Sequence, residues 1–206
     1  MGKLVRFEKL TPKVFVTLVF GIVLVAVAEP KPVEPYYIAA LCVIGVGETI
    51  RLWAAGHLRK NAELTTTGPY AFVKNPLYVG TFLITTGICV LAKGGRTGHP
   101  WVDNLNWILL GLFILTFLVY YIPYKRKREG NRLREIFGET WDVYDRNVPD
   151  YFPRLTPFSH PASAPRRWSA AVTCENSEQW TGMAVAALAL AITFNAPIID
   201  FFAGLF

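Results

Sequence analysis

The sequence predicts an all-α, polytopic integral membrane protein with about five transmembrane helices and a cytoplasmic C-terminal helical segment. The 206 residues are 52% apolar and only 17% charged, with a mean hydropathy of +0.32, which is unusual for a soluble domain. Apolar runs recur at a length suited to a bilayer, and basic residues cluster between them. No internal repeat divides the chain, so we expect one membrane domain over residues 1–206.

Five apolar runs are candidates for crossing a hydrocarbon core, which needs roughly 17–25 helical residues. They lie at about 14–28, 36–55, 77–92, 105–124 and 181–206. The first run is short, follows four basic residues and ends Ala26-Val27-Ala28, so it also fits a secretory signal with its cleavage site. The last run is interrupted at Asn195-Ala196-Pro197, so it is either one kinked span or a span followed by an interfacial piece.

The distribution of basic residues predicts the orientation of these spans. Four Lys or Arg residues precede the first run, and ten lie in the segment 125–179. Because basic loops stay on the cytoplasmic side, we expect the N-terminus, the loop 56–76 and the segment 125–179 to face the cytoplasm. The loop around 93–104 then faces outward, and both polar segments lie on one side of the membrane.

Several classes of function have no support in the sequence. The net charge of +6 is concentrated where a membrane protein meets anionic headgroups, so we expect no nucleic-acid partner. Cys42 and Cys89 lie inside apolar runs, Cys174 stands alone, and the sequence contains no C-x-x-C motif, so we expect no metal site. The sequence also contains no G-x-G-x-x-G, P-loop or G-x-S-x-G motif.

The segment 68–80 carries the first candidate site. Gly68-Pro69 predicts a turn, and Asn75-Pro76 predicts an N-cap followed by proline at the first helical position, with Lys74 just outside the cap. The free N–H groups and positive dipole end of the following helix would then lie beside a lysine. This arrangement favours a carboxylate or phosphate, and we interpret it as half of a cofactor site.

The segment 128–144 carries the second candidate site. Glu129, Leu133 and Phe137 recur on one face of a predicted helix, and Gly138 has the position of a C-terminal stop. We expect Glu129 to lie near the headgroup level at the cytoplasmic mouth of the bundle. The alternative is an ordinary amphipathic interfacial helix in which Glu129 only offsets the neighbouring arginines.

Two ionisable residues lie inside the second apolar run. Glu48 and Arg51 are three residues apart on one helical face. Charged groups in a span are costly, so they usually face the protein interior and form pairs. Two interpretations are open for Arg51: a structural salt bridge, or a role in positioning a bound group.

Taken together, these segments resemble the isoprenylcysteine carboxyl methyltransferase family and its phospholipid methyltransferase relatives. The resemblance covers roughly residues 45–153. The residues that carry it are Gly68, Pro69, Tyr70, Pro76, Tyr78, Gly80, Glu129, Leu133, Phe137, Gly138, Tyr144, Val148, Pro149 and Pro153.

The resemblance implies an integral membrane enzyme that transfers a methyl group from S-adenosylmethionine to a lipidic or hydrophobic acceptor, most like isoprenylcysteine carboxyl O-methylation. Expected partners are a lipidic or prenylated small-molecule substrate and membrane lipids. The alternatives are a phosphatidylethanolamine N-methyltransferase, a nicotinamide-dependent membrane reductase and a non-enzymatic membrane scaffold.

The residue pattern and the resemblance together predict a site. Glu129 and Arg51 are the candidate catalytic residues. The candidate cofactor-binding residues are Gly68, Tyr70, Val73, Lys74, Asn75, Pro76, Tyr78, Gly80, Glu129 and Tyr144. In this hypothesis the cofactor carboxylate binds at the helix N-terminus beside Lys74, and its cationic groups bind Glu129 or aromatic faces.

The sequence departs from the family pattern at three places. Lys74-Asn75 stands where the family usually has Arg-His, Gly130 replaces the second residue of a Glu-Glu pair, and Trp141 replaces a tyrosine. Lysine keeps the charge but lacks the bidentate geometry of arginine. Because asparagine does not titrate, a mechanism with a histidine base at position 75 is excluded.

Overall fold

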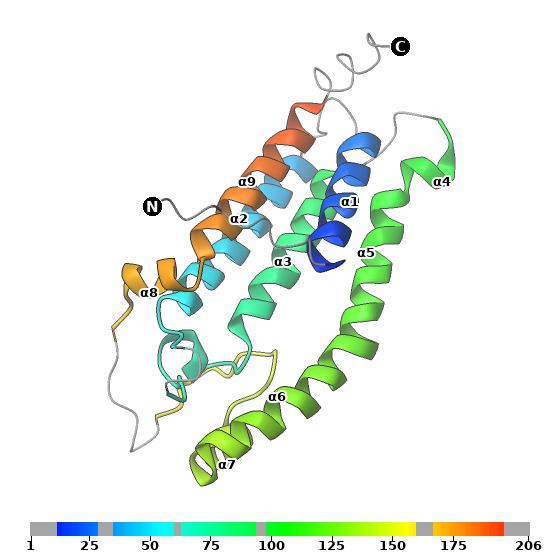
Figure 1. Cartoon of the computed structure of the whole chain (residues 1–206). Helices are drawn as coiled ribbons and strands as arrows, with labels where there is room; N and C mark the ends of the chain where they lie inside the picture. The colour runs from blue at the N-terminus through cyan, green and yellow to red at the C-terminus, as the bar shows by residue number, and fades with distance from the viewer. Residues whose placement is uncertain (1–11, 29–34, 60–62, 94–97, 160–166, 196–206) are drawn as a thin grey trace, which may run out of the picture.

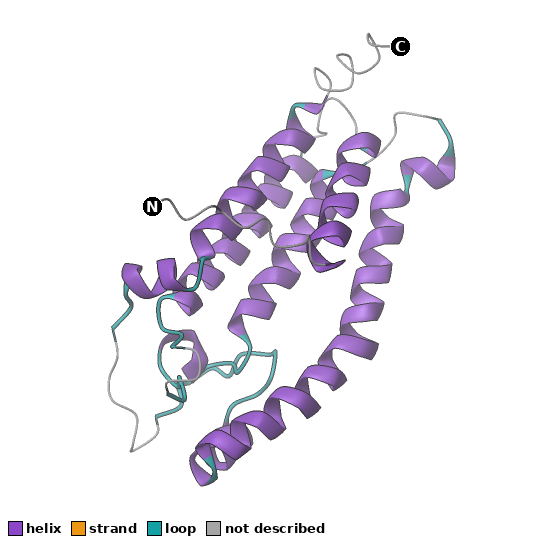
Figure 2. Cartoon of the chain, in the orientation of Figure 1, coloured by secondary structure: helices purple, strands orange, loops and turns teal. Residues whose placement is uncertain are grey.

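The computed structural model describes residues 12–28, 35–59, 63–93, 98–159 and 167–195, which form helices joined by loops (Figures 1 and 2). No strand occurs in these described ranges. The long helices are α1 (Pro12–Val27), α2 (Tyr36–Ala55), α3 (Pro76–Leu91), α5 (Leu105–Thr116), α6 (Ile122–Phe137), α7 (Glu139–Asn147) and α9 (Glu178–Thr193). The short elements are η1 (Gly68–Ala71), α4 (Pro100–Asp103), the π-helical turn η2 (Phe117–Tyr121) and α8 (Ala170–Glu175). The predicted all-α fold class is therefore confirmed.

Glycines let α2 and α3 pack at very short range. A Cβ atom at Gly47 would lie 2.8 Å from the carbonyl oxygen of Gly80, and one at Gly87 would lie 2.9 Å from the carbonyl oxygen of Ala40. Only a residue without a side chain fits at such contacts, which are typical of helix pairs in membranes. The close contact fixes the position of α3 and therefore of the polar turn at its start.

The apolar core lies between α1, α2, α3 and α9. Leu24, Ile44, Ile88 and Ile192 are buried there together. Buried amides satisfy backbone carbonyls at the edge of this core: Asn106 donates to the Cys89 carbonyl at 2.9 Å. Such bonds stabilise the fold, because burying a polar group without a hydrogen-bond partner costs roughly 2–7 kcal/mol.

Two helices of the described chain are long and apolar enough to cross a bilayer: α2, with 20 residues, and the continuous 33-residue helix Leu105–Phe137 formed by α5, η2 and α6. Only 28% and 11% of their most apolar windows are buried, so neither is a buried core helix in this structure. They indicate membrane association. The prediction of five spans is not confirmed, because α1, α3 and α9 have 16 residues each. The possible kink at Pro197 lies outside the described residues.

The segment 138–158, which we call the polar cap, packs at one end of the bundle. Gly138, with φ of 54°, ends α6 and begins the reversal into α7. Trp141, Tyr144 and Val148 pack there with Phe158 and Leu133. The predicted stop at Gly138 is confirmed, and positive φ explains why glycine stands there.

The cap is joined to the turn that precedes α3. The Lys74 amide donates to the Pro149 carbonyl at 2.9 Å, and the Arg154 amide donates to the Phe72 carbonyl at 3.0 Å. These bonds bring the two motif-bearing segments of the sequence into contact, although about 75 residues separate them. Their predicted convergence on one side of the protein is confirmed.

Candidate functional site

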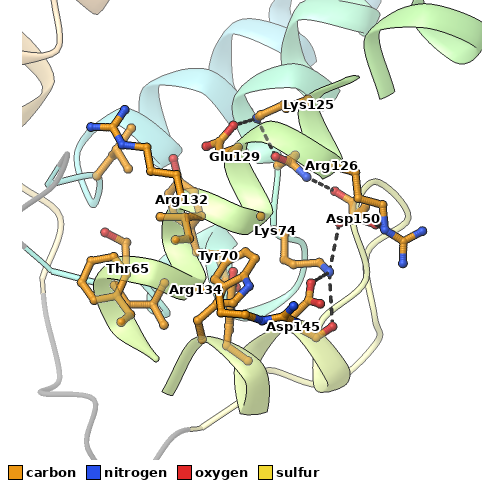
Figure 3. A pocket seen from close by; sticks show the side chains of 18 of the residues that line it. Thr65, Tyr70, Lys74, Lys125, Arg126, Glu129, Arg132, Arg134, Asp145 and Asp150 are labelled. Carbon is orange, nitrogen blue, oxygen red and sulfur yellow. Dashed lines mark hydrogen bonds and ion pairs between the residues drawn. The ribbon is translucent and has the colours of Figure 1, made fainter. Parts of the chain in front are cut away.

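A charged pocket lies between the turn before α3, the helices α6 and α7, and the loop after α7 (Figure 3). Its volume of about 500 Å³ is in the range of small-molecule sites. Six basic and four acidic side chains line it: Arg59, Lys74, Lys125, Arg126, Arg132, Arg134, Glu63, Glu129, Asp145 and Asp150. The pocket is therefore positive overall but offers both signs of charge.

Lys74 is the most deeply held cation of the pocket. Its side chain is only 6% exposed, and its Nζ lies 2.5 Å from Asp145 Oδ1 and 3.0 Å from Asp150 Oδ1. A third bond joins Nζ to the Asp145 carbonyl at 3.2 Å. The Lys74 ammonium group is thus paired with two carboxylates of the protein itself, so it is not free to bind an anion from outside unless they move (Figure 3).

Lys125 connects α6 to the start of α3. Its Nζ donates to Asn75 Oδ1 at 2.7 Å, lies 3.1 Å from Glu129 Oε2 and sits 3.4 Å from the centroid of the Tyr78 ring. Asn75 also donates to the Asp150 carbonyl at 3.1 Å. Asn75 does precede α3 as predicted, but its side chain makes no capping bond because these two partners occupy it.

Tyrosines form the inner wall of the pocket. The Tyr144 hydroxyl donates to the Tyr70 carbonyl at 2.8 Å. Burial raises the pKa of both the Tyr70 and the Tyr144 hydroxyl above the ordinary tyrosine value. Burial, together with the nearby Asp150 carboxylate, raises the pKa of Tyr151 to about 12. All three phenols are therefore neutral at physiological pH.

The structure brings together most of the predicted site residues. Those that line the pocket are Tyr70, Lys74, Asn75, Pro76, Tyr78, Glu129 and Tyr144. Gly68, Val73, Gly80 and Arg51 are not among its lining residues.

Two of the outlying residues are explained by packing. Gly68 has φ of +61°, and a Cβ atom there would lie 2.4 Å from His57 Cδ2. A Cβ atom at Gly80 would lie 2.5 Å from Arg51 Cγ. These motif glycines therefore provide a turn and a close helix contact, and neither requires a ligand.

Arg51 forms a structural ion pair away from the pocket. Its Nε lies 2.6 Å from Glu178 Oε1, and its Nη2 donates to Glu178 Oε2 at 3.0 Å. Nη1 donates to Thr81 Oγ1 at 2.5 Å and to the Leu77 carbonyl at 3.2 Å. Arg51 thus joins α2, α3 and α9. Of the two interpretations left open for Arg51, its contacts match the structural salt bridge, with Glu178 and not Glu48 as the partner.

Sequence reasoning missed three residues that organise the pocket: Lys125, Asp145 and Asp150. Lys125 lies four residues before Glu129, and that spacing on a helix is a signal for an ion pair. Asp145 and Asp150 carry no comparable local signal, because their partner Lys74 is more than 70 residues away in the sequence.

The chain is similar to two metal-resistance proteins. It is 34% identical over 127 residues to the nickel-cobalt-cadmium resistance protein NccN of Alcaligenes xylosoxydans xylosoxydans. This match covers 58% of this chain and 53% of the relative. It is 31% identical over 108 residues to the cobalt-zinc-cadmium resistance protein CzcN of Cupriavidus metallidurans. This match covers 52% of this chain and 44% of the relative. The chain thus spans about half the length of the curated relatives it matches. No family model and no solved structure matches the chain.

These relatives correct the predicted function. Both are named for metal resistance, and neither name describes methyl transfer, so the prediction of a methyltransferase enzyme is wrong. The same names support neither a phosphatidylethanolamine N-methyltransferase nor a reductase. The structure offers a physical reason for the error. Gly68 provides a turn and Gly80 a close helix contact, so these parts of the motif indicate a backbone structure and do not identify a reaction.

Proposed function

We propose that the protein contributes to resistance against nickel, cobalt, cadmium or zinc ions, acting at a membrane through its charged pocket. The observation that carries this proposal is the similarity to two proteins named for resistance to these metals. The two membrane-length helices and the pocket at the polar end of the bundle support the place of action.

In this proposal the pocket binds a small anionic or zwitterionic organic molecule. Six basic against four acidic side chains leave the cavity with a net positive charge, which favours an anion over a bare divalent cation. Within the described ranges, no group of three or more His, Cys, Asp or Glu side chains is placed to hold a metal ion. Glu129, with its carboxylate half-exposed in the pocket, supplies a partner for a positive group on the ligand.

S-adenosylmethionine is one zwitterion of this kind, and its binding stays a prediction. The pocket has the volume and both signs of charge that its amino-acid group requires. Lys74, however, is already paired with Asp145 and Asp150, so the cofactor carboxylate would have to bind a different cation or displace these aspartates.

We also propose that the chain crosses the membrane five times, with the N-terminus and the pocket in the cytoplasm. Helices occupy all five apolar runs of the sequence within the described residues. The basic helix α6 and the pocket lie at the same end of the bundle, as the distribution of positive charge requires.

A deletion and complementation experiment tests the proposed function. The gene is deleted in its own host and restored as wild type, as Lys125→Gln or as Arg146→Gln, and growth is measured against rising Ni²⁺, Co²⁺, Cd²⁺ and Zn²⁺. Lys125→Gln removes the cation that joins Asn75, Glu129 and Tyr78, so we expect it not to restore growth. Arg146 is exposed and lies outside the pocket, so its variant should restore growth fully.

Membrane levels of each protein are measured by immunoblot as the control for expression. Growth that does not depend on the gene for any of the four metals would contradict the role in resistance. Full rescue by Lys125→Gln would be consistent with a role in resistance but would show that this role does not depend on the pocket.

A further inference from the structure

The long helix Leu105–Phe137 carries an outer face that the pocket does not use. Its apolar part, from Leu105 to Ile122, has about 18 residues, and at 1.5 Å per residue this is about 27 Å, close to the thickness of a hydrocarbon core. The membrane boundary on this helix therefore falls near Pro123 and Lys125. The same helix continues beyond it as the basic segment α6.

Two sets of side chains can be distinguished at this boundary, one that lines the pocket and one that does not. On the inner face, Tyr121 contacts the Tyr78 ring at 5.2 Å between centroids, and Lys125 and Glu129 follow at intervals of four residues into the pocket. On the outer face, Tyr120 and Tyr124 are exposed. The π-helical turn η2 ends here, at Tyr121.

The outer face changes character in the order of a membrane interface. Leu112, Leu115 and Val119 are exposed apolar side chains within the apolar part of the helix. Tyr120 and Tyr124 follow, stacked at 5.7 Å between ring centroids with an angle of 9°. Exposed Lys127 and Arg128 come next. Aliphatic, aromatic and basic side chains succeed one another in this order where a helix leaves a bilayer.

The charges of α6 divide in the same way between the two faces. The inner cation Lys125 is paired with Glu129, and Arg134, on the next turns, is paired with Asp142. Lys127 and Arg128 form no ion pair with any residue that the structure describes. Positive charge that is uncompensated from within the protein therefore gathers on the outer face, at the headgroup level.

Arg128 is held in place for such a partner. Its Nη1 donates to the Tyr124 hydroxyl, and its guanidinium carbon lies 5.7 Å from the centroid of the Tyr124 ring. A guanidinium fixed at the aromatic level loses little freedom when it binds a phosphate, and its planar donors match phosphate oxygens.

We propose that this tyrosine–basic face, formed by Tyr120, Tyr124, Lys127 and Arg128, binds the headgroup of an anionic phospholipid. The acyl chains lie along Leu112, Leu115 and Val119, and the phosphate lies between Lys127 and Arg128. The face binds its lipid from the surrounding membrane, and none of its four residues lines the pocket. The proposal does not rest on the role in metal resistance.

Lipid binding to the purified full-length protein tests the proposal. Delipidated protein in neutral detergent is titrated with phosphatidylglycerol or phosphatidylcholine, and bound lipid is counted by native mass spectrometry. We expect phosphatidylglycerol to bind more tightly. Removing one basic residue near a lipid surface should weaken binding about fivefold, so Lys127→Gln/Arg128→Gln should lose roughly 25-fold for phosphatidylglycerol. Binding of phosphatidylcholine should change little.

A matched control variant separates this face from the general effect of net charge. Arg146→Gln/Arg154→Gln removes the same charge from arginines that bond the Asp142 and Asn147 carbonyls, away from the tyrosine–basic face. It should retain the preference for phosphatidylglycerol. Equal losses in both double variants, or no preference in the wild type, would overturn the proposal.

A competition experiment separates a lipid headgroup from free phosphate. Inorganic phosphate is added at an ionic strength matched with chloride. Retention of phosphatidylglycerol supports a lipid site, whereas its displacement by phosphate but not by chloride would assign the face to a soluble anion and overturn the lipid proposal. Metal tolerance of the host is not a readout here, so failure of one proposal is distinguishable from failure of the other.

Discussion

At the scale of single residues, the two ionisable side chains of α2 differ in their hydrogen bonds. Arg51 is bonded by Glu178, Thr81 and a backbone carbonyl, so its guanidinium is compensated. Glu48 lies one turn earlier, and neither of its carboxylate oxygens has a hydrogen-bond partner among the described residues, although both are inaccessible to solvent. A paired charge and an unpaired carboxyl thus occupy one helix face.

We predict that Glu178→Gln destabilises the protein strongly and that Glu48→Gln does not. The first variant leaves Arg51 buried without a carboxylate, and loss of one partner of a buried pair costs about 3–5 kcal/mol. The second variant removes an uncompensated carboxyl, so stability should stay unchanged or rise. Thermal unfolding in detergent, followed by circular dichroism, measures both. Equal destabilisation by the two variants would contradict this division of roles.

At the scale of elements, the contact between α2 and α3 depends on positions without a side chain. Gly87 faces Ile44 and the Ala40 carbonyl so closely that any Cβ atom forces the helices apart. At Gly111, in α5, no atom beyond its chain neighbours and the nearby backbone of its own helix lies within 4 Å of the place where a Cβ would be. The same substitution therefore has different physical effects in two apolar helices.

We predict that Gly87→Ala lowers the free energy of unfolding by about 1–3 kcal/mol, the usual cost of overpacking. Gly111→Ala should be neutral or stabilising by up to about 1 kcal/mol, because alanine favours a helix over glycine. The melting temperatures of the two variants in detergent give the comparison. A Gly87→Ala protein as stable as wild type would show that the helices do not pack this closely.

At the scale of the whole molecule, the arrangement of the ends gives a test of the proposed five-span orientation. α4 and the polar cap lie at opposite ends of the bundle (Figure 1). Trp101, in α4, and Leu155, after α7, are both strongly exposed, with 81% and 99% of their surface accessible. Because both side chains are strongly exposed, their accessibility to a reagent depends on the side of the membrane and not on local burial.

We predict that a membrane-impermeant maleimide, added to intact cells, labels Trp101→Cys but not Leu155→Cys. Both substitutions are made in a background without Cys42, Cys89 and Cys174. Permeabilised cells serve as the control, in which both cysteines should react. Labelling of Leu155→Cys in intact cells would reverse the proposed orientation and place the charged pocket outside the cytoplasm.

The helical class, the ends of several helices and the convergence of the two polar segments could all be predicted from the amino-acid pattern. Hydrophobic runs, Pro76 at the start of α3 and Gly138 at the end of α6 are local signals, because each acts on the backbone within one turn. The charge pattern predicts which segments share a side of the membrane, and that orientation stays a prediction. These features need no knowledge of distant contacts.

The partners of the charged side chains, in contrast, depend on how the helices pack. Arg51 pairs with Glu178 at a separation of 127 residues, and Lys74 pairs with Asp145 at a separation of 71. Such pairs form because a buried charge must be compensated by whichever opposite charge the packed helices bring near it, and that identity is not encoded locally. For the same reason, which motif residues line the pocket and which only pack the helices depends on how α2, α3 and α6 are arranged in space.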